Sequence, residues 1–319
     1  MIINNLKKAA ILAILLVTSL ITILYVMQIE IKKDLSGNLI AEDFIYNFPN
    51  ANKITISNND NNIELLKENN VWKIANGFEI NQEIINSLSN NISNNKYILE
   101  AKPSENSKNI NISIFNDNDK IYNFKISDDN KNSMIKSKIN NSYWLLSNRI
   151  NLPNLDKVNF YKQPLITTDF KEVKEIIITK DSKSLTFSRN EYGSEFNVNN
   201  KKLKGINKAL FAVFARKISN LNYTQVIDIK NIEDLSLLSK FTIKYYSGLI
   251  LNISLSQQNN NHFVTISAKL DRIHKNQSVN IKKNINKKYK DWIFKVKESD
   301  AKVLNNQILL QNTIKNIGA

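Results

Sequence analysis

The sequence predicts an α+β protein with an N-terminal transmembrane helix followed by two tandem, mainly antiparallel β domains, each with one central helix. Three observations lead to this prediction. Residues 9–29 form an uncharged apolar run, short alternating strands dominate the rest of the chain, and the same series of elements returns about 122 positions later. At 319 residues the chain is long enough for two domains.

The run at 9–29, AAILAILLVTSLITILYVMQI, would make a helix about 31 Å long, which matches the hydrocarbon thickness of a bilayer. Lys7 and Lys8 precede it, and Lys32 and Lys33 follow it beside acidic residues. Positive flanks stay in the cytoplasm, so this arrangement weakly favours a cytoplasmic N-terminus. A cleaved signal peptide is the alternative, but its apolar part would be shorter and would end at small residues. We expect a single-pass membrane protein with its N-terminus in the cytoplasm and most of the chain outside it.

Short strands separated by Asn- and Gly-bearing turns begin each proposed domain. In the first copy they lie at 52–57, 63–66 and 71–74, and in the second at 174–179, 185–188 and 195–198. Further strands close each copy, at 111–115, 121–127, 134–139 and 142–146, and at 241–245, 249–255, 262–268 and 291–296. Their alternation is typical of sheets with one buried and one exposed face, so we expect a core in each copy.

One amphipathic helix separates the two groups of strands in each copy. Apolar residues at helical spacing mark it, namely Ile84, Leu88 and Ile92 in the first copy and Ile206, Leu210, Phe214, Ile218 and Leu221 in the second. Val213 would widen the second apolar stripe. A further helix is expected at 299–319, with Ser299-Asp300 as its N-cap; it would pack on the second domain or await a partner.

These patterns divide the chain into a series of segments. We expect a cytoplasmic N-terminus at 1–8, a transmembrane anchor at 9–29, a juxtamembrane linker at 30–50, repeat domain 1 at 51–147, a linker at 148–172, repeat domain 2 at 173–298 and the C-terminal amphipathic helix at 299–319. Pro153 and Pro164 interrupt any regular pattern in the second linker.

The net charge of +15 comes almost wholly from Lys, because the chain has only four arginines. Asn, Ile and Lys are all specified by AT-rich codons, so genome composition explains much of the excess. A nucleic-acid-binding protein would use Arg for bidentate contacts, and we expect no nucleic-acid partner. Cations still gather in a polar insertion at 271–290, where an anionic partner is one interpretation and a solvated, mobile loop the other. The candidate patch comprises Arg272, Lys275, Lys282, Lys283, Lys287, Lys288 and Lys290.

No constellation of reactive residues stands out in the sequence. The chain has no cysteine, and its two histidines, His262 and His274, have no nucleophile nearby. Acidic pairs at Asp117/Asp119 and Asp128/Asp129 lack the remaining features of a calcium loop and suit hairpin turns better. The aromatic residues that recur with the strands, Trp72, Trp144, Phe196 and Trp292, are typical of core positions. We therefore expect no catalytic residue, metal site or cofactor.

The pattern ITIS…IELLKENNVWKI…INQEIINSL, with a closing YWLLS strand, resembles an uncharacterised bacterial family, a domain of unknown function. Its members are membrane-anchored tandem-repeat proteins, often encoded beside gliding-motility-type ABC transporters. The resemblance covers about residues 50–298, although the second copy has Phe196 where the first has Trp72. The resemblance implies an extracytoplasmic accessory component of a membrane complex, anchored in the bacterial inner (cytoplasmic) membrane with most of the chain in the periplasm. The family has no established catalytic residues to carry over.

Three functional hypotheses follow. The first is a non-enzymatic, membrane-anchored scaffold or accessory subunit of an envelope or ABC-transporter-type complex, with the lipid bilayer and an envelope protein as partners. The second is a binding module that holds an anionic envelope component, a lipid headgroup or a glycan, through the basic insertion. The third is an enzyme that acts on envelope polymers, for which a convergent set of acid, base or nucleophile would be needed.

Overall fold

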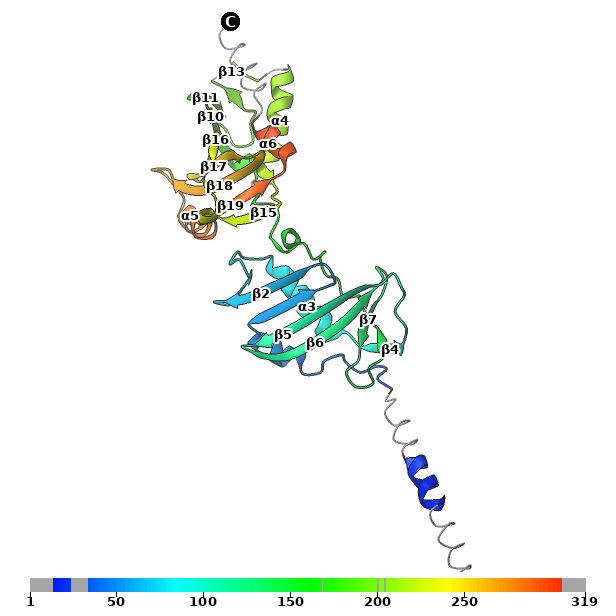
Figure 1. Ribbon diagram of the computed structural model, residues 1–319. Helices are drawn as coiled ribbons and strands as arrows, with labels where there is room; N and C mark the ends of the chain where they lie inside the picture. The colour runs from blue at the N-terminus through cyan, green and yellow to red at the C-terminus, as the bar shows by residue number, and fades with distance from the viewer. Residues whose placement is uncertain (1–13, 24–33, 168, 200, 204, 306–319) are drawn as a thin grey trace, which may run out of the picture. The chain divides into compact units, whose positions relative to one another are not determined.

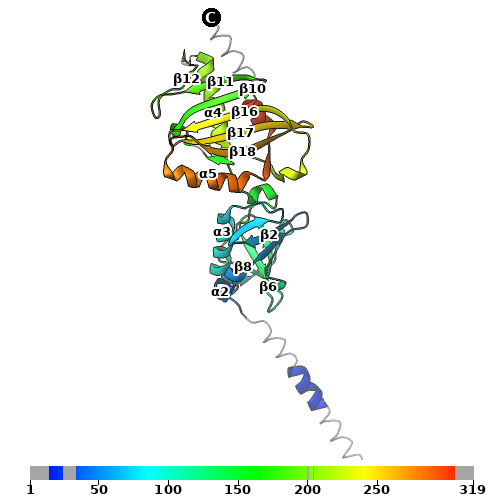
Figure 2. The same cartoon turned by 90° about the vertical axis from the view of Figure 1, so that its left-hand side faces the viewer.

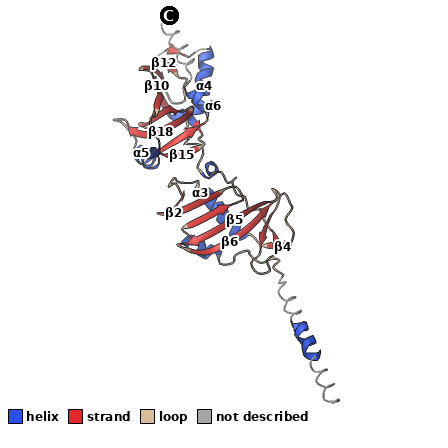
Figure 3. Cartoon of the chain, in the orientation of Figure 1, coloured by secondary structure: helices blue, strands red, loops and turns tan. Residues whose placement is uncertain are grey.

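The computed structural model describes residues 14–23, 34–167, 169–199, 201–203 and 205–305 (Figure 1). The chain divides into two compact units, and the boundary lies between Phe160 and Tyr161. Both units are built mainly from antiparallel strands with a few helices (Figure 3). This confirms the predicted α+β class.

The expected membrane segment is described only in part. Residues 14–23 are helical, and their apolar side chains are exposed, with Ile14 at 63% and Ile23 at 56%. The rest of the 9–29 run and its flanking residues Lys7, Lys8, Lys32 and Lys33 lie outside the described residues. Across the described ranges, no helix combines the length and the apolar character needed to cross a membrane.

The first unit holds one antiparallel sheet in the order β3-β2-β1-β5-β6-β7-β8-β4. Its strands are β1 (Lys53–Ser57), β2 (Asn62–Glu68), β3 (Val71–Ile74), β4 (Tyr97–Glu100), β5 (Lys108–Asn116), β6 (Asp119–Asp128), β7 (Ser133–Lys136) and β8 (Tyr143–Leu146). Its helical elements are α2 (Phe44–Asn47), η1 (Phe48–Asn50), α3 (Gln82–Asn94) and η2 (Lys157–Phe160).

Helix α3 covers the apolar face of this sheet. The side chain of Asn81 caps it by accepting a hydrogen bond from the backbone N–H of Glu83. Ile85, Leu88 and Ile92 are its buried residues. Ile84, which the sequence pattern placed in the buried stripe, is only half-buried, because the i, i+3, i+7 series that starts at the next residue faces the sheet.

The second unit has a nine-stranded sheet in the order β13-β12-β11-β10-β16-β17-β18-β19-β15, and β9 pairs separately with β14. Its strands are β9 (Ile166–Thr167), β10 (Val173–Lys180), β11 (Lys183–Ser188), β12 (Asn197–Val198), β13 (Lys201–Lys202), β14 (Asn220–Leu221), β15 (Gln225–Asp228), β16 (Ser236–Tyr245), β17 (Leu249–Gln258), β18 (Asn261–Leu270) and β19 (Trp292–Val296). Its helical elements are η3 (Phe170–Glu172), α4 (Gly205–Ser219), η4 (Ile229–Asn231), α5 (Asn276–Tyr289) and α6 (Glu298–Leu304).

Helix α4 packs on this sheet through phenylalanines. Phe211 stacks on Phe187 of β11 with ring centroids 4.4 Å apart, and Phe214 lies 5.7 Å from Phe241 of β16. Val213 was expected to widen the buried stripe, but this was wrong, since it is 55% exposed. The helix turns Phe211 toward the sheet instead.

The two sheets follow one plan. Apart from the additional edge strand β13, each strand of the second sheet has a counterpart at the same place in the first. Cross-strand pairing also gives equivalent positions across three neighbouring strands: Ile54, Ile114 and Tyr122 in the first sheet, and Ile176, Ile243 and Leu251 in the second. Leu251 on β17 therefore holds the place that Tyr122 holds on β6.

Both segments expected to be linkers contribute to the cores. In residues 34–50, Leu35 and Phe44 are buried against the first unit, because this stretch carries apolar side chains that the sheet face can accept. In residues 148–172, Leu155 is buried in the first unit and Leu165 in the second. The sequence of these segments shows no regular alternation of apolar residues, but some of their apolar side chains are nevertheless buried.

The segment after β19 forms α6. It begins at Glu298 after Lys297, which differs from the expected Ser299-Asp300 cap. The carboxylate of Asp300 is buried and pairs with Lys217 of α4 at 2.8 Å, so this part packs on the second unit. The remainder of the expected C-terminal helix, from residue 306, lies outside the described residues.

Candidate functional site

Most of the basic insertion forms helix α5, Asn276–Tyr289, so the interpretation of this stretch as a mobile loop is wrong. Figure 2 shows α5 running along β18. The side-chain amide of Asn286 accepts a hydrogen bond from the N–H of Ala268 at 2.7 Å and donates one to its carbonyl at 2.9 Å. At the start of the helix, the buried hydroxyl of Ser278 donates to the carbonyl of Ser247 at 3.0 Å. These bonds fix α5 to the sheet. The second unit therefore has α5 on its sheet in addition to α4, and the prediction of a single central helix is wrong for this unit.

The predicted cations do not form a single patch. Lys283, Lys287 and Lys290 are exposed and share one face, because they stand at i, i+4 and i+7. Lys282 and Lys288 are half-buried on other faces of the helix. The remaining two, Arg272 and Lys275, precede the helix and are exposed. The structure therefore keeps three of the seven expected cations together.

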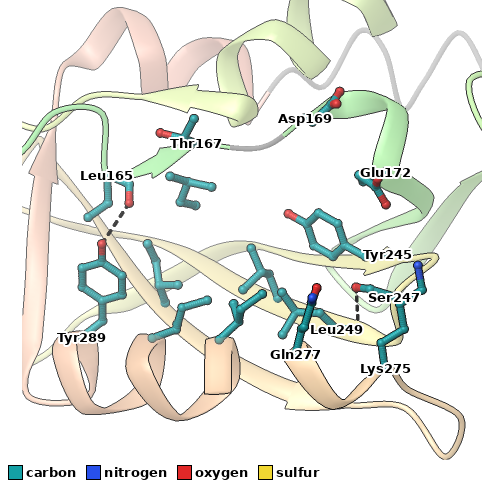
Figure 4. A pocket seen from close by; sticks show the side chains of 15 residues that line it. Leu165, Thr167, Asp169, Glu172, Tyr245, Ser247, Leu249, Lys275, Gln277 and Tyr289 are labelled. Atoms are coloured by element: carbon teal, nitrogen blue, oxygen red, sulfur yellow. Dashed lines mark hydrogen bonds between the residues drawn. The ribbon is translucent and has the colours of Figure 1, made fainter. Parts of the chain in front are cut away.

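A pocket of about 470 Å³, here named the α5 pocket, lies between α5, the sheet and residues from 165–167 and 169–172 (Figure 4). Its apolar lining comes from three parts of the unit: Leu165 and Ile166; Leu249, Leu251 and Ile266 of the sheet; and Ile281 and Ile285 of α5. At one end the Tyr289 hydroxyl donates a hydrogen bond to the carbonyl of Leu165 at 3.1 Å. This bond ties the C-terminal turn of α5 to the opposite wall.

Polar groups gather at the other end of the α5 pocket. Figure 4 shows Asp169 and Glu172 on one wall, facing Lys275 and Gln277 on the opposite wall, with the ring of Tyr245 between them. The Asp169 carboxylate accepts a hydrogen bond from the backbone N–H of Lys171 at 2.9 Å, which holds it as the cap of η3. The pocket thus combines an apolar interior with carboxylates and an ammonium group on facing walls.

The sequence pattern did not predict this pocket. Its lining comes from a segment interpreted as a linker and from one interpreted as a polar insertion. The signal was the spacing of Ile281, Ile285 and Tyr289 at i, i+4 and i+8 within the lysine-rich stretch, which indicates an amphipathic helix. The surrounding charge obscured that pattern.

The histidines examined in the sequence lie apart from the pocket lining. His262 lies at the start of β18, and exposed His274 contacts the carbonyl of Asp271 through Nδ1 at 3.0 Å. Trp292 of β19 is half-buried, whereas the other recurring aromatic residues, Trp72, Trp144 and Phe196, are buried as expected.

The acidic pairs lie in or next to turns of the first unit. Asp117 stands in the β5–β6 turn with φ +52°. Asp128 is mostly buried and accepts two hydrogen bonds from Arg149, and Asp129 accepts backbone bonds from Lys131 and Asn132. Among the described residues, no group of three or more His, Asp or Glu side chains is placed to hold a metal ion.

Comparison with protein-family models, with curated proteins and with solved structures finds no match to this chain. The resemblance drawn from the strand and helix pattern therefore stays a prediction.

Proposed function

We propose that this chain is a single-pass membrane protein whose two β-rich units form a non-enzymatic scaffold or accessory subunit outside the cytoplasm. The observation that carries the proposal is the uncharged run at 9–29, placed directly before two units that share one strand order. Such a run suits the bilayer interior, and the large apolar side chains described within it, such as Ile14, Leu15 and Leu20, are exposed.

Tandem duplication of one domain accounts for the shared plan. Each unit buries its own apolar residues, with Phe44 and Ile54 fully buried in the first and Phe187 and Phe241 in the second. Repetition of a domain without a reactive constellation multiplies binding surface, which suits a component that holds other proteins together. The resemblance of the strand and helix pattern to membrane-anchored tandem-repeat proteins supports the further proposal that the complex is an envelope or ABC-transporter-type complex.

Crosslinking in native membranes followed by affinity purification of the full chain tests this function. We expect a permease or another integral envelope subunit to be recovered in a fixed ratio, and recovery to fall when Leu15→Arg and Leu20→Arg put charges into the apolar run. Matched changes outside the run, Lys183→Arg and Lys230→Arg, should leave recovery unchanged. A chain that elutes alone from mild detergent, with no crosslinked partner, contradicts the proposal.

A second function, binding of an anionic envelope component, is favoured by one specific observation. Helix α5 contains no Asp or Glu and exposes Lys283 and Lys287 on one face. Near an anionic surface each such cation contributes about 1 kcal/mol, fading beyond the Debye length. The chain has no cysteine, so an environment-sensitive dye on Asn280→Cys reports on this face alone.

In proteoliposomes that contain phosphatidylglycerol, we expect the dye to shift to the blue, and the shift to disappear at about 0.5 M salt. Lys283→Ser with Lys287→Ser should abolish the shift. The charge-matched control, Lys183→Ser with Lys230→Ser, should keep it. A shift that is independent of salt and of both substitutions contradicts a role for this face.

A further inference from the structure

The region of the first unit that corresponds to the α5 pocket is filled by aromatic rings. Phe44, which is fully buried, lies 5.0 Å from Tyr122 and 6.1 Å from Phe124, measured between ring centroids. Tyr122 and Phe124 stack in turn, at 5.8 Å. The first unit therefore closes this part of its sheet face with its own side chains.

In the second unit the equivalent residues are smaller. Leu251 stands in the place of Tyr122, as the cross-strand pairing shows. Ile166 precedes η3 by the same number of residues as Phe44 precedes η1, so an isoleucine stands where the first unit has a phenylalanine. Side chains normally fill the interior of a protein, but here a pocket of about 470 Å³ remains beside the smaller residues.

Helix α5 is the second difference between the units at this place. The first unit joins β7 to β8 through residues 137–142, whereas the second joins β18 to β19 through α5. The added helix supplies Ile281 and Ile285 to the pocket wall. On the same plan, the second unit thus lacks the filling aromatic rings and has an additional wall. Both differences enlarge a partly open pocket of the size that small ligands occupy.

The lining identifies the chemistry of the ligand. The interior offers aliphatic side chains, which bind a hydrocarbon chain. The polar end offers two carboxylates, Asp169 and Glu172, opposite the ammonium group of Lys275 (Figure 4). Groups of both signs on facing walls match a ligand that carries both charges.

We propose that the α5 pocket binds a single-chain amphiphile with a zwitterionic headgroup. Its hydrocarbon chain lies against Leu251 and Ile281, its ammonium group faces Asp169 and Glu172, and its phosphate faces Lys275. The inference concerns the second unit alone and does not depend on the anchor or on a protein partner.

Native mass spectrometry of the full chain in non-ionic detergent tests the proposal, with lysophosphatidylethanolamine as the probe and lysophosphatidylglycerol as the anionic comparison. We expect one molecule of the former to stay bound after the micelle is removed, with clear preference over the latter. Leu251→Tyr, which restores the residue type of the first unit, should weaken binding at least about tenfold, because it fills the pocket.

Ile281→Trp gives a second way to fill the pocket from the helix side, in case Leu251→Tyr disturbs the sheet. Val279→Trp is its matched control, because Val279 lies on the same helix, is 42% exposed against 44% for Ile281, and does not line the pocket. Glu172→Gln and Lys275→Gln should each weaken binding about two- to fivefold. Binding is compared only among variants whose far-ultraviolet circular dichroism spectra match that of the unchanged chain, so that all of them are folded.

Retention of the probe by Ile281→Trp at the level of the unchanged chain would place the lipid elsewhere and overturn the proposal. Equal binding of the two lysophospholipids would overturn the assignment of a zwitterionic headgroup. The absence of any retained molecule also contradicts it. None of these readouts depends on where the protein resides, so they are separate from the test of the proposed function.

Discussion

The guanidinium group of Arg189 lies over the ring of Phe196, with 4.5 Å between its Cζ and the ring centroid. Its N–H groups donate to backbone carbonyls, from Nε to Val173 at 2.7 Å, from Nη1 to Ser194 at 3.0 Å and from Nη2 to Phe170. Burial lowers the pKa of this side chain below its usual value. A buried cation thus joins η3, the start of β10 and the segment before β12.

Replacement of Arg189 by lysine should destabilise the second unit by about 2–3 kcal/mol, because a single ammonium group leaves some of these carbonyls without a donor. Thermal unfolding followed by circular dichroism measures the effect. Arg216→Lys is the control, because Arg216 is exposed on α4, and it should change stability by less than about 0.5 kcal/mol. Equal unfolding temperatures for the two variants would show that the bonds of Arg189 add nothing to stability.

In the first unit, Arg149 and Asp128 form a two-point ion pair, at 3.0 Å and 2.8 Å. The Arg149 side chain is about one-third exposed, so solvent screens the pair, and we expect Arg149→Met to cost about 1–2 kcal/mol. Chemical denaturation in guanidinium measures this. The exposed pair of Lys302 and Glu298 is the comparison, and Lys302→Met should cost less than about 0.5 kcal/mol. If the two substitutions lower the free energy of unfolding by the same amount, the two-point geometry of the Arg149–Asp128 pair adds nothing to stability.

Phe44→Ala should destabilise the first unit by about 3–5 kcal/mol, because it removes a fully buried ring and leaves a cavity over Tyr122. Tyr46→Ala in the same short helix is the control, since Tyr46 is 79% exposed. Differential scanning calorimetry separates the two effects. A small loss for Phe44→Ala would mean that residues 34–50 are a linker after all.

Asn286→Ala should release α5 from β18, because the amide of Asn286 bonds both the N–H and the carbonyl of Ala268. We expect a loss of about 1–2 kcal/mol and faster hydrogen exchange at the Ala268 amide. The exposed neighbour Asn284 provides the control through Asn284→Ala. Unchanged exchange at Ala268 in Asn286→Ala would contradict this attachment.

Stability should fall in acid. Backbone hydrogen bonds from Asn132 and Lys131 lower the pKa of the Asp129 carboxyl, and a hydrogen bond from Lys208 lowers that of Glu195. Because the folded-state pKa lies below the unfolded-state value, the ionised forms stabilise the fold above the unfolded value, and this is lost as pH falls through the folded value. We expect the unfolding temperature to be level down to about pH 5 and to drop below about pH 4. Asp129→Asn should reduce that drop, and a rise in stability between pH 5 and pH 3 would contradict the assignment.

The alternating strands could be predicted from the sequence because each had one face to bury. Lys53–Ser57 and Val173–Lys180 lie within a residue of the ranges expected for them. The edge strands β4 and β15 were missed, since each is short and Ile98 of β4 is exposed, which leaves no alternation to detect. Pairing with a distant strand, which local sequence does not encode, determines their structure.

The candidate site was less accessible to prediction. Lys283 and Lys287 were predicted as part of a basic patch. Positive charge alone does not show whether such lysines lie on one face of a helix or in a loop. The α5 pocket depends on smaller side chains at Leu251 and Ile166, and their effect appears only when the two units are aligned by strand pairing. The replacement of aromatic residues by smaller ones cannot be recognised from single positions of the sequence.

The proposed function depends on residues 9–29 acting as a membrane anchor, and because the chain has no cysteine, single introduced cysteines can report on which side of the membrane each part lies. Single cysteines replace Asn5, Asn90 on α3 and Asn280 on α5, and intact spheroplasts are treated with a membrane-impermeant maleimide. We predict labelling of Asn90→Cys and Asn280→Cys without lysis, and of Asn5→Cys only after lysis, with all three resistant to alkaline extraction of the membrane. Protection of all three positions until lysis, or release of the full chain at alkaline pH, would contradict it.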